Sequence, residues 1–171
     1  PPVHGCGSSA VIEGDLLLFS ADGAKSPFLM ALDKRTGQVR WKALRDADGK
    51  RKFSFCTPLV IEVAGKRQII SPASDYVFSY DLAGKTLWKL HYPGGYSVVP
   101  RPVYAHGLVY VCSGFNQPIL HAIRPTGKGD VSKTHLAWKT NRSAPHSSSV
   151  IVTNGLLFMA ADSGVVSCLD A

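Results

Sequence analysis

Seven polar residues are the first candidates for chemistry, because carboxylates, an amide, imidazoles and a guanidinium recur at similar places along the sequence. Carboxylate and imidazole groups supply ligands to cations, and arginine orients anions. A surface that gathers such groups could bind a cation or a polar ligand, although Asp and Asn also close turns in any β-protein. The candidate ligand-binding residues are His4, Asp22, Asp75, Arg101, Asn116, His146 and Asp162.

Serine chemistry has a weaker basis. Ser147, Ser148 and Ser149 follow His146, so a nucleophile and a base are present as residue types. No GxSxG elbow surrounds them, and the triplet reads better as the segment leading into a strand. We therefore predict no catalytic residues. The remaining histidines fall in expected strands or outer turns and are predicted to be structural: His91, His106, His121 and His135.

The cysteines carry little chemical signal. Cys6, Cys56, Cys112 and Cys168 form no CxxC pair and have no ligand-like spacing with histidine, so we predict no metal site. Their even number permits disulfides. Because they fall at different places within the repeats described next, small buried thiols are the expected state.

Internal repeats organise the elements that must position these residues. Trp41, Trp88 and Trp138 lie 47 and 50 positions apart, and short apolar runs separated by turn signals surround each of them. A period of about 40 to 50 residues is that of one four-stranded propeller blade. We therefore predict one domain, residues 1–171, with blades over about 8–45, 56–92 and 99–140 and an incomplete fourth blade over about 147–171.

The third and fourth strands of each repeat are joined by a turn with its own pattern. In the first repeat, Asp33 can bond to local backbone, Gly37 accepts a positive φ, and Trp41 follows on the fourth strand. A large flat ring at that place can cover the gap between neighbouring blades. The residues assigned to this repeated structural pattern are Asp33, Gly37, Trp41, Asp81, Gly84, Trp88 and Trp138.

The segment from Ala31 to Trp41, ALDKRTGQVRW, resembles the tryptophan-docking repeat of pyrroloquinoline-quinone (PQQ)-like propellers. The second repeat matches less well. The third has Arg124 where Asp is expected and an insertion around Gly127 to Asp130. The resemblance implies an all-β fold, a β-propeller of four-stranded antiparallel blades that is incomplete at about four blades, and a periplasmic or secreted location.

Charge and chain length set further expectations. The formal net charge is +7, but the cations are scattered without interleaved aromatic residues, so we predict no nucleic-acid partner. No apolar run approaches the roughly 20 residues that span a bilayer, so no transmembrane segment is expected. Because propellers close with 4 to 8 blades, we expect either a longer parent protein or a homodimer that closes a ring.

Our preferred hypothesis is a non-catalytic propeller that acts as a scaffold for a protein or polysaccharide partner. One alternative is part of a quinoprotein-like dehydrogenase, a PQQ-dependent oxidoreductase with PQQ and calcium. Members of the family that this sequence resembles carry an adjacent Cys-Cys pair. This sequence lacks such a pair, so no cofactor is predicted. A second alternative is a propeller similar to the outer-membrane assembly factor.

Overall fold

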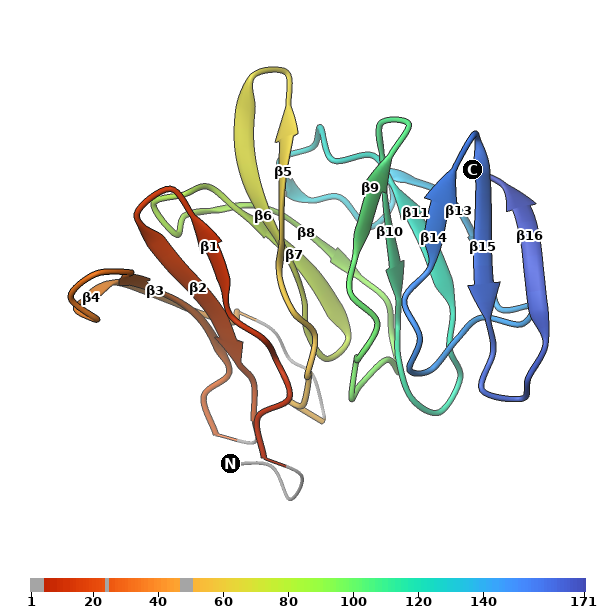
Figure 1. Ribbon diagram of the computed structural model, residues 1–171, viewed down its shortest axis with the longest axis horizontal. Helices are drawn as coiled ribbons and strands as arrows, with labels where there is room; N and C mark the ends of the chain where they lie inside the picture. The colour runs from red at the N-terminus through yellow and green to blue at the C-terminus, as the bar shows by residue number, and fades with distance from the viewer. Residues whose placement is uncertain (1–4, 24, 47–50) are drawn as a thin grey trace.

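The computed structural model describes residues 5–23, 25–46 and 51–171, in which every regular element is a β-strand. Sixteen described strands form four separate sheets that stand side by side along an arc (Figure 1). This confirms the all-β expectation. Within the described residues, no helix is long and apolar enough to cross a membrane.

Each sheet is built around three or four antiparallel strands in chain order, and we call the sheets blades 1 to 4. Blade 1 contains β1 (Val11–Glu13), β2 (Leu16–Ala21), β3 (Phe28–Asp33) and β4 (Val39–Leu44). Blade 2 contains β5 (Leu59–Val63), β6 (Lys66–Pro72), β7 (Tyr76–Tyr80) and β8 (Thr86–His91). Blade 3 contains β9 (Val103–Ala105), β10 (Leu108–Cys112), β11 (Leu120–Ile123) and β13 (Leu136–Thr140). Blade 4 contains β14 (Ile151–Thr153), β15 (Leu156–Ala160) and β16 (Val166–Asp170).

Two-residue turns join the first and second strands of the blades. His106 and Gly107 have φ angles of 50° and 75°, and Asn154 and Gly155 have φ angles of 50° and 77°. Two successive positive φ angles are typical of the type I′ turn, whose twist matches that of the flanking strands. These turns keep the first two strands of each blade in tight register.

A short strand from blade 3 completes blade 2. β12 (Gly129–Asp130) belongs to the insertion before β13 and pairs in parallel with β8. The next residue, Val131, is buried between the two blades, and its N–H donates to the carbonyl of Lys89 at 2.9 Å. The outer edge of β8 is therefore covered, which removes an edge open to pairing with other chains.

Apolar clusters fill the three spaces between neighbouring blades and hold the blades in place. Between blades 1 and 2 the buried residues include Leu18, Leu29, Ile69, Phe78 and Tyr80. Between blades 2 and 3 they include Ile70, Val77, Trp88, Val109 and Ile123. Between blades 3 and 4 they include Tyr110, Leu120, Val150, Leu157 and Met159.

The three tryptophans differ in their surroundings. Trp41 reaches from blade 1 to blade 2, where its Nε1 donates to the carbonyl of Leu82 at 2.9 Å and its ring lies over Gly84. Trp88 is fully buried and donates to Oε1 of Gln68 within its own blade at 3.0 Å. The ring of Trp138 is tilted against a tyrosine of the same blade.

The predicted turn residues adopt the expected geometry in blade 1. The carboxylate of Asp33 accepts bonds from the N–H groups of Arg35 and Thr36, and Gly37 has a φ of 73°. Arg40 also donates to Asp33 at 2.6 Å, and this contact holds the pKa of Asp33 below its ordinary range. In blade 2, Asp81 and Gly84 form a similar turn.

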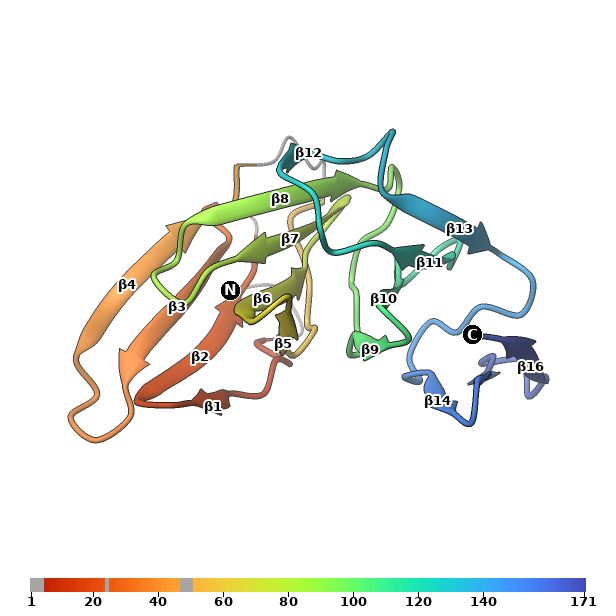
Figure 2. The same ribbon diagram turned by 90° about the horizontal axis from the view of Figure 1, so that it is seen from above.

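Viewed from above, the four blades follow an arc and do not close into a ring (Figure 2). The first strands of the blades lie on the concave side, and blades 1 and 4 lie at opposite ends. This confirms the predicted incomplete propeller of about four blades.

Candidate functional site

One end of the blades gathers the loops that carry most of the candidate residues. The connections from β2 to β3, β6 to β7, β10 to β11 and β15 to β16 all lie at the lower end in Figure 1. The segments between blades reach the same end. We call this end the loop face and define it by residues 51–57, 73–75, 92–101, 113–118, 141–149 and 161–164.

A pocket of about 400 Å³ opens on the loop face between blades 2 and 3. Two of the candidates, Asp75 and Asn116, come together in its wall. Arg51 lies over the ring of Tyr96 there, with the guanidinium carbon 4.4 Å from the ring centroid. The described residues that line the pocket are Arg51, Asp75, His91, Pro93, Gly94, Tyr96 and Asn116.

The wall around Asp75 is held by its own backbone and side chain. Asp75 has a φ of 61°, and its carboxylate accepts a bond from the N–H of Gly94 at 2.7 Å. Its N–H donates to Gly95 at 2.6 Å, and its carbonyl accepts from the N–H of Tyr92 at 2.8 Å. These bonds tie the β6–β7 turn to the segment that leaves blade 2, so the carboxylate is pre-positioned.

An aromatic row runs from the pocket toward blade 4. Phe115 is 54% exposed, and its ring centroid lies 5.7 Å from that of Tyr96 and 5.8 Å from that of His146. The N–H of Phe115 donates to the carbonyl of Tyr96 at 2.9 Å. Three aromatic rings from three loops therefore form a fixed, partly apolar surface beside the pocket.

Gly114 allows this close approach of blade 3 to the segment leaving blade 2. Its φ is 82°, and a Cβ atom there would lie 2.7 Å from the carbonyl oxygen of Tyr96 and 2.8 Å from the Cα of Val98. Only glycine fits without a backbone shift. The position of Phe115 thus depends on the glycine before it.

His146 and Asp162 form a second pair of candidates that the structure brings together. The N–H of His146 donates to Oδ2 of Asp162 at 2.7 Å, and the ring Nδ1 lies 3.6 Å from the same oxygen. The backbone bond from His146 lowers the pKa of Asp162. This pair lies at the blade 4 end of the aromatic row.

The remaining candidates lie elsewhere. Arg101 is exposed, and its N–H donates to Oγ of Ser149 at 3.0 Å, which links the starts of blades 3 and 4. His4 lies outside the described residues. Asp22 lies beneath the surface, with only 1% of its side chain exposed.

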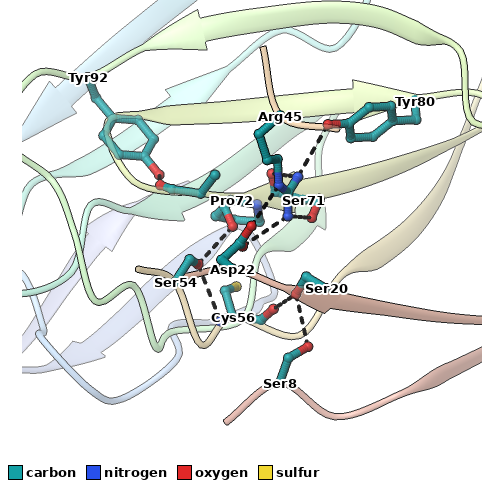
Figure 3. Close-up of polar contacts among 11 residues, drawn as sticks. Ser8, Ser20, Asp22, Arg45, Ser54, Cys56, Ser71, Pro72, Tyr80 and Tyr92 are labelled. Carbon is teal, nitrogen blue, oxygen red and sulfur yellow. Dashed lines mark hydrogen bonds and ion pairs between the residues drawn. The ribbon is translucent and has the colours of Figure 1, made fainter. Parts of the chain in front are cut away.

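Asp22 forms a buried two-point ion pair with Arg45 (Figure 3). Nε and Nη2 of Arg45 donate to the two carboxylate oxygens at 3.0 and 3.1 Å. Arg45 also donates to Oγ of Ser71 at 2.9 Å and to the hydroxyl of Tyr80 at 3.3 Å. The guanidinium of blade 1 is therefore bonded to two residues of blade 2.

The electrostatics of this pair favour the charged arginine. Burial by itself lowers the pKa of Arg45, but the charges of Asp22 and Tyr80 and the hydrogen bonds to both together outweigh it and raise that pKa. Burial raises the pKa of the Asp22 carboxyl, against the lowering effect of Arg45. Because each group would be unpaired without the other, the pair acts as one structural unit.

Further buried bonds surround the pair (Figure 3). Ser20 donates to the carbonyl of Cys56 at 2.9 Å, and Ser54 donates to that of Pro72 at 2.9 Å. The hydroxyl of Tyr92 donates to the carbonyl of Ala73 at 2.5 Å. These contacts join the segments beneath the loop face and make it rigid.

The four cysteines are free thiols. Cys56 and Cys112 are buried, and burial raises the pKa of Cys112 to about 12. Cys6 and Cys168 are exposed, so the expectation of buried thiols is met at two of the four positions and is wrong at the other two. The reason is positional, because Cys168 lies on the uncovered side of blade 4.

The arrangement is suited to binding. Ser148 donates to the carbonyl of Ala160, and Ser149 accepts from the backbone of Arg101, so both hydroxyls have structural partners. Among the described residues, no group of three or more His, Cys, Asp and Glu side chains is placed to hold a metal ion.

Sequence reasoning missed several residues of this face. Arg51 is one of the scattered cations for which no role was predicted, and His91 was predicted to be structural, yet both line the pocket. Arg45 gave no signal because its partner lies 23 positions earlier. The only local sign that Phe115 is exposed is its position beside Asn116 in an expected turn.

Comparison with solved structures identifies the architecture. BamB from Moraxella catarrhalis is 17% identical, with a TM-score of 0.63 over 96% of this chain and 49% of that chain. The computationally designed Ika4 protein is 12% identical, with a TM-score of 0.62 over 96% of this chain and 89% of that chain. Quinohemoprotein alcohol dehydrogenase from Comamonas testosteroni is 18% identical, with a TM-score of 0.58 over 80% of this chain and 21% of that chain.

These likenesses and the arc of blades show that the protein has a β-propeller fold. The family model of the outer membrane protein assembly factor BamB matches residues 4–171. The chain therefore belongs to that family. It spans about half the length of the Moraxella protein, and no curated protein matches its sequence.

Proposed function

We propose that this chain is a non-catalytic PQQ-like propeller module that binds an extended segment of a protein partner at its loop face, outside the cytoplasm. The observation that carries the proposal is the pocket with its neighbouring aromatic row. Arg51 and Asp75 supply opposite charges, Asn116 supplies an amide, and Phe115 supplies exposed apolar area. Such a mixture suits a peptide chain with both polar and apolar side chains.

Rigidity of the face supports the same function. The loops are tied to one another by backbone–backbone bonds at Asp75 and Phe115 and by the bond from the N–H of His146 to the carboxylate of Asp162. A pre-positioned surface loses less conformational entropy when a partner binds. Membership of the BamB family supports a protein partner over a small substrate.

The test is a binding screen of the purified chain against an array of overlapping peptides from bacterial envelope proteins, with an array of bacterial polysaccharides beside it. We expect peptide binding that Phe115→Ala and Arg51→Ala each weaken by about tenfold or more, as truncation of an interface hot spot does. The matched control is Glu62→Ala, at an exposed position on the opposite end of blade 2, which should bind as the original chain does.

Two outcomes would contradict the proposal. Binding to polysaccharides alone, sensitive to the same variants, would keep the face but change the class of partner. Dye reduction by the chain with an alcohol and added PQQ and calcium would instead identify a quinoprotein-like dehydrogenase.

A further inference from the structure

The protein itself satisfies the acidic groups of the loop face but not the basic ones. The carboxylate of Asp75 accepts a bond from the N–H of Gly94 at 2.7 Å. The carboxylate of Asp162 accepts one from the N–H of His146, also at 2.7 Å. The cations of the face have side chains that form no ion pair and no hydrogen bond with any described residue, and they are Arg51, Lys52, Arg101 and Arg142. The face therefore presents unpaired positive charge.

Arg51 places one of these cations in the wall of the pocket between blades 2 and 3. Its side chain is exposed, and its guanidinium carbon lies 4.4 Å from the centroid of the Tyr96 ring. A guanidinium that stacks on an aromatic ring keeps the N–H donors at its planar edge for a carboxylate. Asp75 lines the same pocket, but no ion pair joins it to Arg51. Arg51 can therefore pair with a carboxylate from a partner.

Tyr96 connects this cation to the exposed apolar part of the face. The ring of Phe115 is 54% exposed and lies 5.7 Å from the ring of Tyr96, between centroids. An extended chain advances about 3.3 Å per residue, and its alternate side chains point the same way. Two residues thus cover about 6.6 Å, which matches the step from one of these contacts to the next.

We propose that the segment bound at the loop face is acidic. An Asp or Glu side chain of the partner pairs with Arg51, and a large apolar side chain two residues away packs on Phe115. This inference rests on the peptide binding proposed above and names the kind of sequence that the face selects. The other unpaired cations of the face attract further acidic residues in the flanks of the segment.

Cations beside aromatic rings also suit a single-stranded nucleic acid. The two carboxylates favour a peptide over that partner. Asp75 lies in the pocket wall with Arg51, and Asp162 lies at the far end of the aromatic row. A chain of phosphates that followed the rings would meet a negative charge at both places, whereas a peptide needs only one or two acidic side chains.

The experiment is an array of nine-residue peptides in which Glu and Phe stand one to five residues apart in a background of Ser and Thr. Matched sets carry Gln or Lys in place of Glu. We expect the strongest binding at a separation of two residues, about fivefold weaker binding with Gln, and weaker binding still with Lys. At about 0.5 M salt the difference between the Glu and Gln peptides should shrink.

Charge reversal in the protein gives the decisive comparison. Arg51→Glu should invert the order, so that the Lys peptides bind best. Lys66→Glu makes the same change of charge at an exposed position on the opposite end of blade 2 and should keep the original order. An order that Arg51→Glu leaves unchanged would show that this side chain does not read the charge and would overturn the inference.

The remaining outcomes separate this inference from the proposed function. Equal binding of the Glu, Gln and Lys peptides, still weakened by Phe115→Ala, would leave peptide binding in place and overturn the acidic preference. Absence of binding to every peptide would overturn both. A single-stranded thymidine oligonucleotide that binds more tightly than any peptide, and that Arg51→Glu releases, would identify a nucleic acid as the partner and overturn both as well.

Discussion

Arg45 and Asp22 show how a single pair of residues can join two blades. Both side chains are buried, and the guanidinium reaches Ser71 and Tyr80 of the neighbouring blade. Removal of one partner from a buried pair leaves the other charge without compensation. Asp22 is therefore better explained by stability than by ligand binding, which is a hypothesis that stability measurements can check.

Arg45→Met should lower the free energy of unfolding by about 3 to 5 kcal/mol, since the Asp22 carboxylate stays buried and unpaired. Urea denaturation followed by circular dichroism measures this change. The control is Lys34→Met, which removes an ion pair to an Asp15 side chain that is 78% exposed and should change stability by less than about 1 kcal/mol. If both changes lowered the free energy of unfolding equally, the buried pair would stabilise the fold no more than the exposed pair does.

His121 should make stability depend on pH. It is buried beside Tyr92, and burial lowers its pKa from 6.5 to about 4. The unfolded chain takes up the proton below pH 6.5 and the folded chain only below about pH 4. The free energy of unfolding should therefore fall by up to about 3 kcal/mol as the pH drops from 6.5 to 4.

Denaturation curves at several pH values check this prediction. His121→Gln should remove that part of the slope, whereas His106→Asn, at an exposed turn, should keep it. Asp33 does not interfere in this range, because its lowered pKa makes its stabilising effect fall away only below the ordinary value of 3.8. A slope that persists in the His121 variant would contradict the assignment.

At the scale of elements, two similar glycine turns allow the cost of local backbone strain to be distinguished from the cost of a clash with a neighbouring blade. Gly84 and Gly164 occupy similar turns, with φ angles of 83° and 86°, so both disfavour a side chain. They differ in their neighbours. A Cβ atom on Gly84 would lie 2.7 Å from the Trp41 ring, and one on Gly164 would meet no atom within 4 Å.

Gly164→Ala should therefore destabilise by about 1 kcal/mol through backbone strain alone. Gly84→Ala should cost about 2 kcal/mol more, because the tryptophan of blade 1 must move as well. Thermal or urea denaturation of both variants gives the difference. Equal effects would mean that contact between Trp41 and Gly84 does not stabilise the pairing of blades 1 and 2.

The sequence predicted these elements well where the signal was local. Repeat spacing and turn residues identified the blades, and Asp33 and Gly37 marked a turn correctly. The insertion around Gly127 to Asp130 was visible as a departure from the repeat. Its pairing with β8 was not predictable, because that contact joins residues about 40 positions apart and depends on where Val131 packs.

At the scale of the whole molecule, some features of the loop face follow from local sequence signals, and others depend on contacts between distant residues. Asp75 and Asn116 occupy similar turns in successive repeats, so the repeat placed them on the same face, whereas His146 and Asp162 come from two different kinds of connection at that face. The aromatic row and the contact of Arg51 with Tyr96 depend on how adjacent blades approach each other. Repeats determine which loops share a face, but the distances between loops follow from interblade packing.

The strand exchanged from blade 3 to blade 2 also limits how such a protein can change over generations. In repeat proteins, stability is approximately the sum of the stabilities of the repeats and of the interfaces between neighbouring repeats. Here a breakpoint between blades 2 and 3 would strip β8 of its parallel neighbour and expose the space that Val131 fills. Loss or exchange of one of these two repeats should therefore destabilise the other.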